Sequence, residues 1–249
     1  MSFFGNIFRR SKIVSSIKSG SNNISVVESG DSRVRELLYN GVVYSRFRRG
    51  ELYTGSYWDY LLPPAFAFEK PKVLVIGLGG GTVQYQLGKI LGKNAVVDTV
   101  ESDQKIIDIW RRFFPKAGSR VFNWDGSDFV KHKQNSYDVI ILDAYQDLEI
   151  PRSFIADSFI DDAHKCLKDK GVLAINFAQS VGRREEMLSY IGKLKRRFIV
   201  RIVKAGSFSD NVVIVCMKNI SPEGFLTRAS EMMQGQKSVM KAYLSWREL

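Results

Sequence analysis

Three carboxylates, Glu101, Asp125 and Asp143, each follow a run of β-prone residues and are the side chains best suited to chemistry. In an open parallel sheet, ligands bind beyond the carboxyl ends of the strands, so residues in these places meet at one edge. A carboxylate there can accept hydrogen bonds from ribose hydroxyls or from an amine, and it can remove a proton. The alternative for each is an exposed charge or a helix cap, so the neighbouring residues decide.

A glycine-rich turn follows the apolar residues 72–76 and leads into a helical pattern; its members are Gly77, Gly79, Gly80 and Gly81. A side chain at Gly77 or Gly79 would collide with a ligand lying across the strand ends, and the helix N-terminus offers free N–H groups. Glu101 comes 20 residues after Gly81, the distance expected for a carboxylate that binds both ribose hydroxyls. The turn and the carboxylate together predict a binding site for an adenosine-containing molecule.

Two further segments extend this site. Asp125 can accept a hydrogen bond from the exocyclic amine of adenine while a backbone N–H near Gly126 serves a ring nitrogen, although a plain turn would have the same sequence. Asp143 begins a loop rich in carboxylates and lies directly over the predicted crevice. The other members of that loop are Tyr145, Asp147 and Glu149. Such a loop suits a cationic substrate.

Continuous apolar runs separated by helical patterns predict a parallel sheet with helices on both faces, an α/β fold. The predicted parallel strands cover residues 72–76, 96–100, 120–123, 137–142 and 171–177. Residues 198–203 and 212–217 then form an antiparallel hairpin, because the loop between them is too short for a crossover helix. A terminal hairpin is typical of the class I methyltransferase fold, the Rossmann-like fold that binds S-adenosylmethionine. A nicotinamide-binding domain would add parallel strands instead and would have glycine at Thr82.

The N-terminal part predicts a separate small β unit. Asn40 and Gly41 separate two β-prone runs, residues 34–39 and 42–47, and favour a β-hairpin because both turn positions need positive φ. Residues 24–28 add a third strand. The predicted division is a basic N-terminal segment, a small β domain and a Rossmann-like catalytic domain, over residues 1–22, 23–55 and 56–249. The basic segment is either an amphipathic helix that touches a membrane or a partner or, as we favour, a terminus packed on a subunit.

The net charge of +11 over 249 residues is unevenly distributed. Residues 1–50 hold nine Lys and Arg against three Asp and Glu, a balance of +6, whereas residues 98–162 hold eight against thirteen, a balance of −5. Because the acidic segment carries the candidate site, a small cationic substrate is favoured over nucleic acid, which stays possible. Two cysteines and two histidines argue against a disulfide framework and against a metal site, and they favour a cytoplasmic protein. We expect no membrane span.

Several segments fall in an order and spacing that together are typical of one enzyme family. They are the hairpin, Tyr57-Trp58-Asp59, Val73-Leu74-Val75-Ile76-Gly77, Val100-Glu101-Ser102-Asp103, Asp125-Gly126-Ser127-Asp128-Phe129 and Tyr137-Asp138-Val139-Ile140-Ile141-Leu142-Asp143. Over residues 34–180 the chain resembles the spermidine synthase (polyamine aminopropyltransferase) family. The resemblance implies that decarboxylated S-adenosylmethionine donates an aminopropyl group to a diamine or polyamine, without a metal, in a homodimer or homotetramer.

The resemblance also implies roles for individual residues. Glu101 would bind the ribose and Asp125 the adenine, beside the four glycines of the turn and Gly126. Asp143 would orient and deprotonate the attacking amine, and Tyr57 would line the channel for the aminopropyl group and the acceptor. Further substrate-binding positions would be Trp58, Asp59, Tyr145 and Asp147. Aromatic faces among them could hold the sulfonium and ammonium groups by cation–π contact.

Three positions depart from the family pattern. Gly80 stands where the family has an Asp that recognises the free amine of the donor, Trp58 replaces His or Gln, and the loop after Asp143 is one residue longer. With the following Ile150-Pro151, this loop resembles a divergent spermidine-synthase-like group. Without the loop carboxylate, intact S-adenosylmethionine and methyl transfer become the alternative activity, on a small molecule, RNA or protein. A non-catalytic nucleoside-binding relative is a third reading.

Overall fold

The computed structural model describes residues 11–146, 149–178, 184–206, 210–232 and 237–246. Within these ranges, seven strands form one sheet in the order β10-β11-β9-β8-β5-β6-β7. The strands are β5 (Lys72–Ile76), β6 (Val96–Glu101), β7 (Arg120–Asn123), β8 (Tyr137–Leu142), β9 (Leu167–Ala178), β10 (Ile199–Lys204) and β11 (Asn211–Met217). Strands β5 to β9 run parallel, and β11 is antiparallel to both of its neighbours. The predicted Rossmann-like sheet with a terminal antiparallel hairpin is confirmed.

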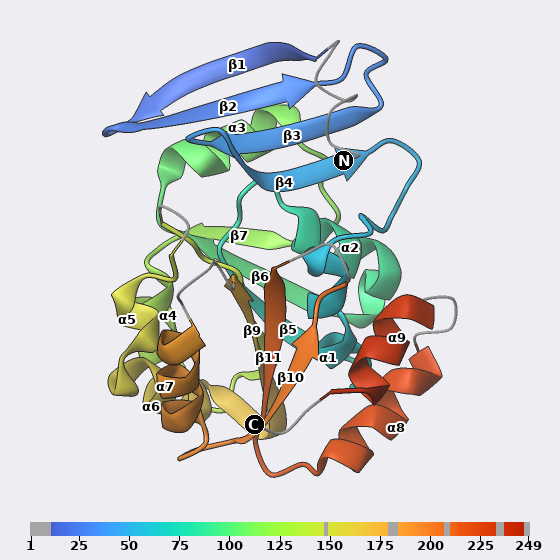
Figure 1. Cartoon of the computed structure of the whole chain (residues 1–249), viewed down its shortest axis with the longest axis vertical. Helices are drawn as coiled ribbons and strands as arrows, with labels where there is room; N and C mark the ends of the chain where they lie inside the picture. Colours follow the sequence, from blue (N-terminus) through green and yellow to red (C-terminus); the bar gives the residue numbers. More distant parts are fainter. Residues whose placement is uncertain (1–10, 147–148, 179–183, 207–209, 233–236, 247–249) are drawn as a thin grey trace.

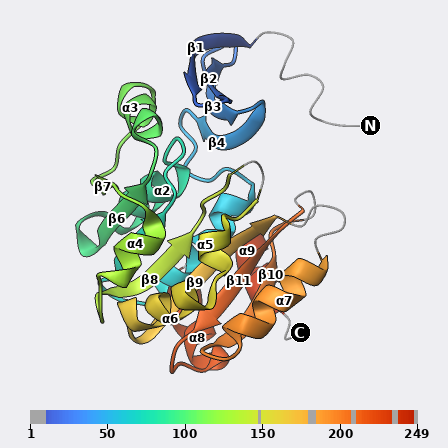
Figure 2. The same ribbon diagram turned by 90° about the vertical axis from the view of Figure 1, so that its left-hand side faces the viewer.

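The central strands are largely apolar because helices cover both faces of the sheet (Figures 1 and 2). In β5, Val73 and Val75 pack into one core while Leu74 and Ile76 pack into the other. The first core is closed by η3 (Tyr57–Leu61), α1 (Pro63–Phe66), α2 (Thr82–Leu91), α8 (Pro222–Met232) and α9 (Lys237–Leu244). The second is closed by α4 (Gly126–Lys131), α5 (Arg152–Ile155), α6 (Asp157–Cys166) and α7 (Arg184–Leu194). A short 3-10 turn, η4 (Gly92–Asn94), follows α2.

A second sheet of four antiparallel strands forms the described N-terminal part of the chain and lies above the main sheet in Figure 1. Its strands are β1 (Lys12–Ser19), β2 (Asn22–Glu28), β3 (Val34–Tyr39) and β4 (Val42–Arg48). The predicted hairpin turn is present, with φ of 49° at Asn40 and 81° at Gly41. Apolar residues of this sheet pack on helix α3 (Gln104–Phe113), whose Ile106 and Trp110 are buried there. Helix α3 therefore joins the small sheet to the end of β6.

The predicted boundary between the basic segment and the β domain differs from the observed strands. Strand β1 lies in the segment that the charge pattern set apart, and it pairs along its length with β2. The strand gave no clear signal, because β1 is an edge strand without a buried residue and its apolar and polar residues do not alternate regularly. The sheet thus begins at Lys12, and the first ten residues lie outside the described ranges.

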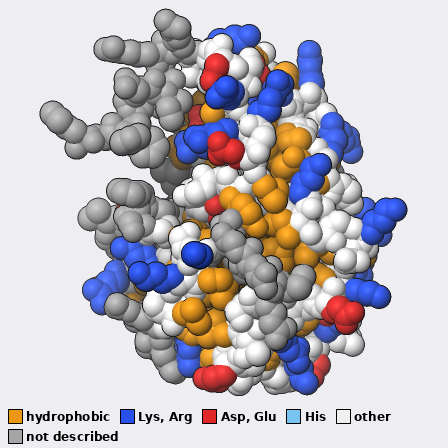
Figure 3. Space-filling view, turned by 90° about the vertical axis from the view of Figure 1, so that its right-hand side faces the viewer, with side chains coloured by type: hydrophobic (Ala, Val, Ile, Leu, Met, Phe, Trp, Pro, Cys, Tyr) orange, Lys and Arg blue, Asp and Glu red, His pale blue; other side chains and the backbone are white. Residues whose placement is uncertain are grey.

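Lys and Arg side chains are spread over the molecular face in Figure 3, with few Asp and Glu side chains among them. On this face the positive charge is therefore dispersed among other side chains. In the described part of the chain, no helix combines the length and apolar character that a membrane span requires.

Candidate active site

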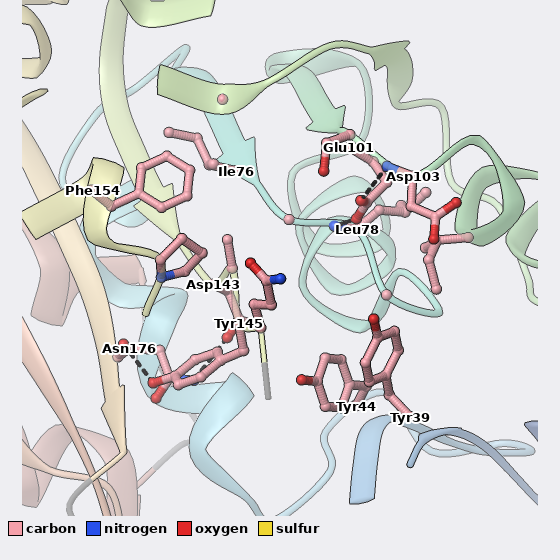
Figure 4. Close-up of a pocket in the computed structure, with 18 of the residues that line it drawn as sticks. Tyr39, Tyr44, Ile76, Leu78, Glu101, Asp103, Asp143, Tyr145, Phe154 and Asn176 are labelled. Atoms are coloured by element: carbon pink, nitrogen blue, oxygen red, sulfur yellow. Dashed lines mark hydrogen bonds between the residues drawn. The ribbon is translucent and has the colours of Figure 1, made fainter. Parts of the chain in front are cut away.

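A cavity of about 530 Å³ opens beyond the carboxyl ends of β5, β6, β8 and β9 and is roofed by the β3–β4 hairpin. Figure 4 shows Glu101, Leu78 and Asp103 on one side of it and Asp143, Tyr145 and Asn176 on the other. The lining residues come from both sheets and from α4, α5 and η3. The predicted meeting of strand-end carboxylates at one edge is therefore observed.

Gly77 and Gly79 allow other backbone segments to approach the turn. At Gly77, φ is +96° and a Cβ would lie 2.4 Å from the carbonyl oxygen of Asp143. At Gly79, φ is +50° and a Cβ would lie 2.7 Å from Oγ of Ser45. Both glycines line the cavity. The turn is thus glycine-rich partly for its own packing, because the end of β8 and the edge of β4 both press against it.

Gly80 and Gly81 do not line the cavity, and a Cβ at either position would point into the protein. The N–H of Gly80 donates to Oγ of Ser45 at 2.7 Å, and a Cβ at this position would lie 2.9 Å from Cβ of Ser45 and 3.0 Å from the ring of Phe114. Gly81 is the N-cap of α2 with φ of +84°, and its Cβ would meet Trp110 at 2.7 Å. Neither glycine lines the cavity, so a carboxylate at position 80 would have no room there.

Glu101 ends β6 and is held by backbone groups. Its two carboxylate oxygens accept hydrogen bonds from the N–H of Leu78 at 3.0 Å and from the N–H of Asp103 at 2.9 Å. Burial raises the pKa of Glu101, and these two hydrogen bonds oppose the rise. One bond per oxygen leaves acceptor capacity on both, which is what a pair of ribose hydroxyls requires.

Asp125 is the N-cap of α4, and it also lines the cavity. Its Oδ1 accepts from the N–H groups of Ser127 and Asp128 at 2.8 and 3.0 Å, so the residue is a helix cap at the cavity wall, and its contact with adenine stays a prediction. Gly126 is needed because a Cβ there would lie 2.4 Å from Cγ2 of Ile76. Ile76 and Phe154 both line this end of the cavity, which makes an apolar slot for a flat ring.

Asp143 directly follows β8, on the opposite side of the cavity from Glu101. Its Oδ1 accepts a 2.7 Å hydrogen bond from Nδ2 of Asn176, and Oδ1 of Asn176 in turn accepts from Nδ2 of Asn211 at 2.7 Å. Burial raises the pKa of Asp143 to about 6, although the bond from Asn176 lowers it. A carboxyl group with a pKa near neutrality can take up and release a proton at physiological pH.

Two tyrosines surround Asp143. Burial raises the pKa of Tyr57 well above its ordinary value, and Asp143, Tyr145 and Tyr44 raise it further. Tyr57 therefore stays protonated as a hydrogen-bonding group. The hydroxyl of Tyr145 donates to the carbonyl oxygen of Asn176 and accepts from the N–H of Ala178, both at 2.8 Å. Its ring lines the cavity, while its hydroxyl ties the loop after β8 to the end of β9.

Trp58 and Asp59 are not brought to the cavity. Trp58 is buried in the core under the sheet, with its ring centre 4.4 Å from that of Tyr57. The carboxylate of Asp59 accepts from the N–H of Gly55 and from Nε2 of Gln86, both at 2.7 Å. These two residues help to hold η3, from which Tyr57 lines the cavity. Asp147 lies outside the described residues.

Several cavity residues had no place in the sequence prediction. Asn176 and Asn211 line the cavity beside Asp143, and Tyr39 and Tyr44 stack on each other at 5.0 Å under the roof. The signal for Asn176 was present, since a fully buried amide in the apolar strand β9 needs a partner. The tyrosines alternate like any sheet residues, so their sequence pattern carries no functional signal.

The charged side chains that line the cavity are all acidic among the described residues. Among the described residues, its lining includes four carboxylates and no Lys, Arg or His side chain; the acids are Glu101, Asp103, Asp125 and Asp143. Such a lining repels phosphate groups and attracts cations. The described residues also include no group of three or more His, Cys, Asp or Glu side chains placed to hold a metal ion.

Comparison with known proteins shows which family the sequence belongs to. The family model for the spermine/spermidine synthase domain matches residues 62–206, which span β5 to β10. The chain belongs to the spermine/spermidine synthase family. A polyamine aminopropyltransferase of Aquifex aeolicus is 31% identical over 199 residues, which cover 76% of this chain and 68% of that protein. A probable polyamine aminopropyl transferase of Bifidobacterium longum is 35% identical over 125 residues, which are 49% of this chain but 28% of the relative.

Solved structures agree on the fold. A probable spermidine synthase of Corynebacterium glutamicum superimposes with a TM-score of 0.73 over 94% of this chain and 95% of its own, at 17% identity. Spermidine synthase of Thermotoga maritima superimposes with a TM-score of 0.71 over 94% of this chain and 84% of its own, at 19% identity. The four-stranded sheet and the Rossmann-like domain of this spermidine synthase family member are therefore one known architecture. The similarity of the relatives' sequences favours aminopropyl transfer over methyl transfer.

Proposed function

We propose that this spermidine synthase family member transfers an aminopropyl group from decarboxylated S-adenosylmethionine to a diamine or polyamine. The observation that carries the proposal is the cavity whose described charged lining is entirely acidic, with Glu101 and Asp143 on opposite sides. Both reactants are cations, and the donor also carries a ribose and an adenine. The names of the relatives in Aquifex aeolicus and Bifidobacterium longum support the same reaction.

The residues present fit a nucleoside donor. Glu101 offers acceptor capacity to the ribose hydroxyls, Ile76 and Phe154 form the slot for adenine, and Asp125 lies at its edge. The turn at Gly77 and Gly79 leaves the space between this end and Asp143 free of side chains. The donor's reactive carbon would then lie on the Asp143 side, where Tyr57 and Tyr145 present aromatic surface to a sulfonium cation.

The proposed step is a direct displacement. The nitrogen of the acceptor amine forms a bond to the terminal carbon of the aminopropyl group as the carbon–sulfur bond breaks. The electron pair of that bond passes to sulfur, and methylthioadenosine leaves as a neutral thioether. Asp143, with its raised pKa, binds the amine and takes its proton. Because the sulfonium carbon is already activated, alignment of the two reactants supplies most of the acceleration.

The test is product analysis by mass spectrometry with matched donors. Decarboxylated S-adenosylmethionine and intact S-adenosylmethionine are each offered with putrescine, cadaverine, agmatine and spermidine. Methylthioadenosine together with an aminopropylated amine supports the proposal. S-adenosylhomocysteine together with a methylated product would replace it with methyl transfer, and calorimetric binding of nucleosides without any product would indicate a non-catalytic relative.

We also propose that the protein acts in the cytoplasm as a homodimer or homotetramer. Cys166 and Cys216 are both buried as free thiols, which suits a reducing compartment. Edge strand β1 exposes 67% of Ile13, an apolar contact that a second copy could cover. Light scattering on the purified protein measures the assembly, and a monomer at micromolar concentration would contradict it.

A further inference from the structure

Three side chains on neighbouring strands form a row of hydrogen bonds that all point in one direction. Asn211 begins β11 and donates to Asn176 in β9, which donates to Asp143 after β8, each at 2.7 Å. In the β9–β11 ladder, Asn211 faces Ala178 and Asn176 faces Val213, so the two amides are diagonal neighbours on one face of the sheet. The row thus crosses three adjacent strands and ends on the carboxylate.

The direction of this row has a chemical consequence. An ionised carboxylate only accepts hydrogen bonds, so it is stabilised when Asn176 presents its NH₂ group and destabilised when Asn176 presents its oxygen. The side-chain oxygen of Asn176 is the end that Asn211 binds. Asn211 therefore favours the amide orientation of Asn176 that faces Asp143 with a donor, and the side chain of Tyr57 is a further hydrogen-bond partner of Asn176. Asn176 is fully buried, so water does not offer it an alternative partner.

We propose that Asn211 and Asn176 are positioning residues that form a directional amide relay and orient Asp143 toward the acceptor amine. This inference rests on the proposed aminopropyl transfer. The relay occupies Oδ1 of Asp143, and among the described residues no donor binds Oδ2. Oδ2 is the oxygen left to bind the amine and take its proton. Asn211 acts on the base through its hydrogen bond to Asn176.

Other titratable groups near Asp143 come from several elements. Tyr57 of η3 and Tyr145 of the loop after β8 lie closest, and Tyr44 of β4 lies near Tyr57. The remaining cavity carboxylates are on the opposite side or at the adenine end. Tyr57 stays neutral across the working pH range, because burial raises its pKa well above the usual value. A change in the relay should therefore appear as a shift in the titration of Asp143.

The test is a double-mutant cycle in which the titration of Asp143 is measured by carboxyl carbon NMR in the ligand-free protein. The Asp143→Asn spectrum assigns the signal. Asn176→Leu removes the donor and should raise the titration midpoint of Asp143 by about one pH unit. Asn211→Leu should raise it by less, because Asn176 then adopts both orientations. The double variant should match Asn176→Leu alone, since Asn211 acts through Asn176.

Enzyme kinetics give the second readout. The acidic limb of the pH profile of kcat should move to higher pH in both single variants, while KM for the donor stays within about twofold. Asn94→Leu, at an exposed position of η4, is the control and should change neither quantity. If Asn211→Leu does not fold, Asn211→Ala replaces it in both measurements.

Two outcomes would overturn the relay. The first is a midpoint that does not move in Asn211→Leu and Asn211→Ala, and the second is single shifts that simply add in the double variant. If the titration midpoint of Asp143 shifts as predicted in all three variants but the protein transfers no aminopropyl group, the relay stands and the proposed function is wrong. The two failures are therefore distinguishable.

Discussion

Glu101 and Asp143 lie on either side of the central strand β5, at the ends of β6 and β8, and each is a half-buried carboxylate whose pKa is raised by desolvation. Glu101 is held by two backbone N–H groups, from Leu78 and Asp103. Asp143 is held by one side-chain amide, from Asn176. Backbone donors fix the geometry of a binding group, whereas a single side-chain donor leaves the second oxygen and the proton available for chemistry. Under the proposed function, the Glu101 end is therefore suited to bind the donor and the Asp143 end to react.

The largest expected effect separates reaction from binding at the Asp143 end. Asp143→Asn keeps the shape and the hydrogen bond from Asn176 but removes the proton acceptor, so kcat should fall by about 10²–10⁴-fold. Binding of methylthioadenosine, measured by calorimetry, should stay within a few-fold. The exposed Asp108→Asn is the matched control and should keep the full rate. A full rate in Asp143→Asn would show that this end does not supply the base.

The same carboxylate should lower the stability of the fold at neutral pH. Its pKa is about 6 in the folded protein against 3.8 for an ordinary Asp, so the folded state holds a proton between these values that the unfolded state has released. Stability from this group therefore falls as the pH rises through that window, by about 3 kcal/mol in total. Urea unfolding should show Asp143→Asn more stable than the wild type at pH 7.5, with the difference vanishing near pH 4. An equal difference at both pH values would contradict the raised pKa.

At the Glu101 end the expected effect is on affinity. Glu101→Gln turns one carboxylate oxygen into an NH₂ group, which cannot accept from Leu78 or Asp103 and offers less to the ribose. Affinity for the donor should fall by about 10–100-fold, as expected for lost hydrogen bonds to a charged group, while kcat at saturating donor is largely kept. The exposed Glu51→Gln is the control. A fall in kcat with unchanged affinity would reverse the contrast between the two ends.

The smallest expected effect concerns the turn that separates the two carboxylates. Gly80→Ala places a Cβ 2.9 Å from Ser45 and 3.0 Å from Phe114, so the free energy of unfolding should fall by about 1–3 kcal/mol. Gly192→Ala in α7 meets nothing within 4 Å and should raise it by about 0.5–1 kcal/mol. Urea unfolding measures both. An unchanged stability in Gly80→Ala combined with altered donor selectivity would mean that position 80 faces the donor.

The pattern of apolar runs predicted the central sheet closely. The strands at residues 72–76 and 137–142 have the predicted bounds, because a strand buried on both faces must be apolar at nearly every position. Strand β1 was missed, because an edge strand with solvated side chains has no such requirement. The fold was therefore predictable where burial constrained the sequence.

The amino-acid sequence by itself determined the donor end of the site. Glycines that permit close approach, and a carboxylate at a fixed distance along the chain, are local features whose geometry follows from one strand, one turn and one helix. Only the tertiary structure decided the acceptor end. Asn176 binds Asp143 from 33 residues further along the chain, and Asn211 binds Asn176 from another 35 residues on. A network of side chains between strands leaves no spacing rule in the sequence. It also decided that Gly80 packs under the N-terminal sheet, because Ser45 and Phe114 meet it only in the folded protein.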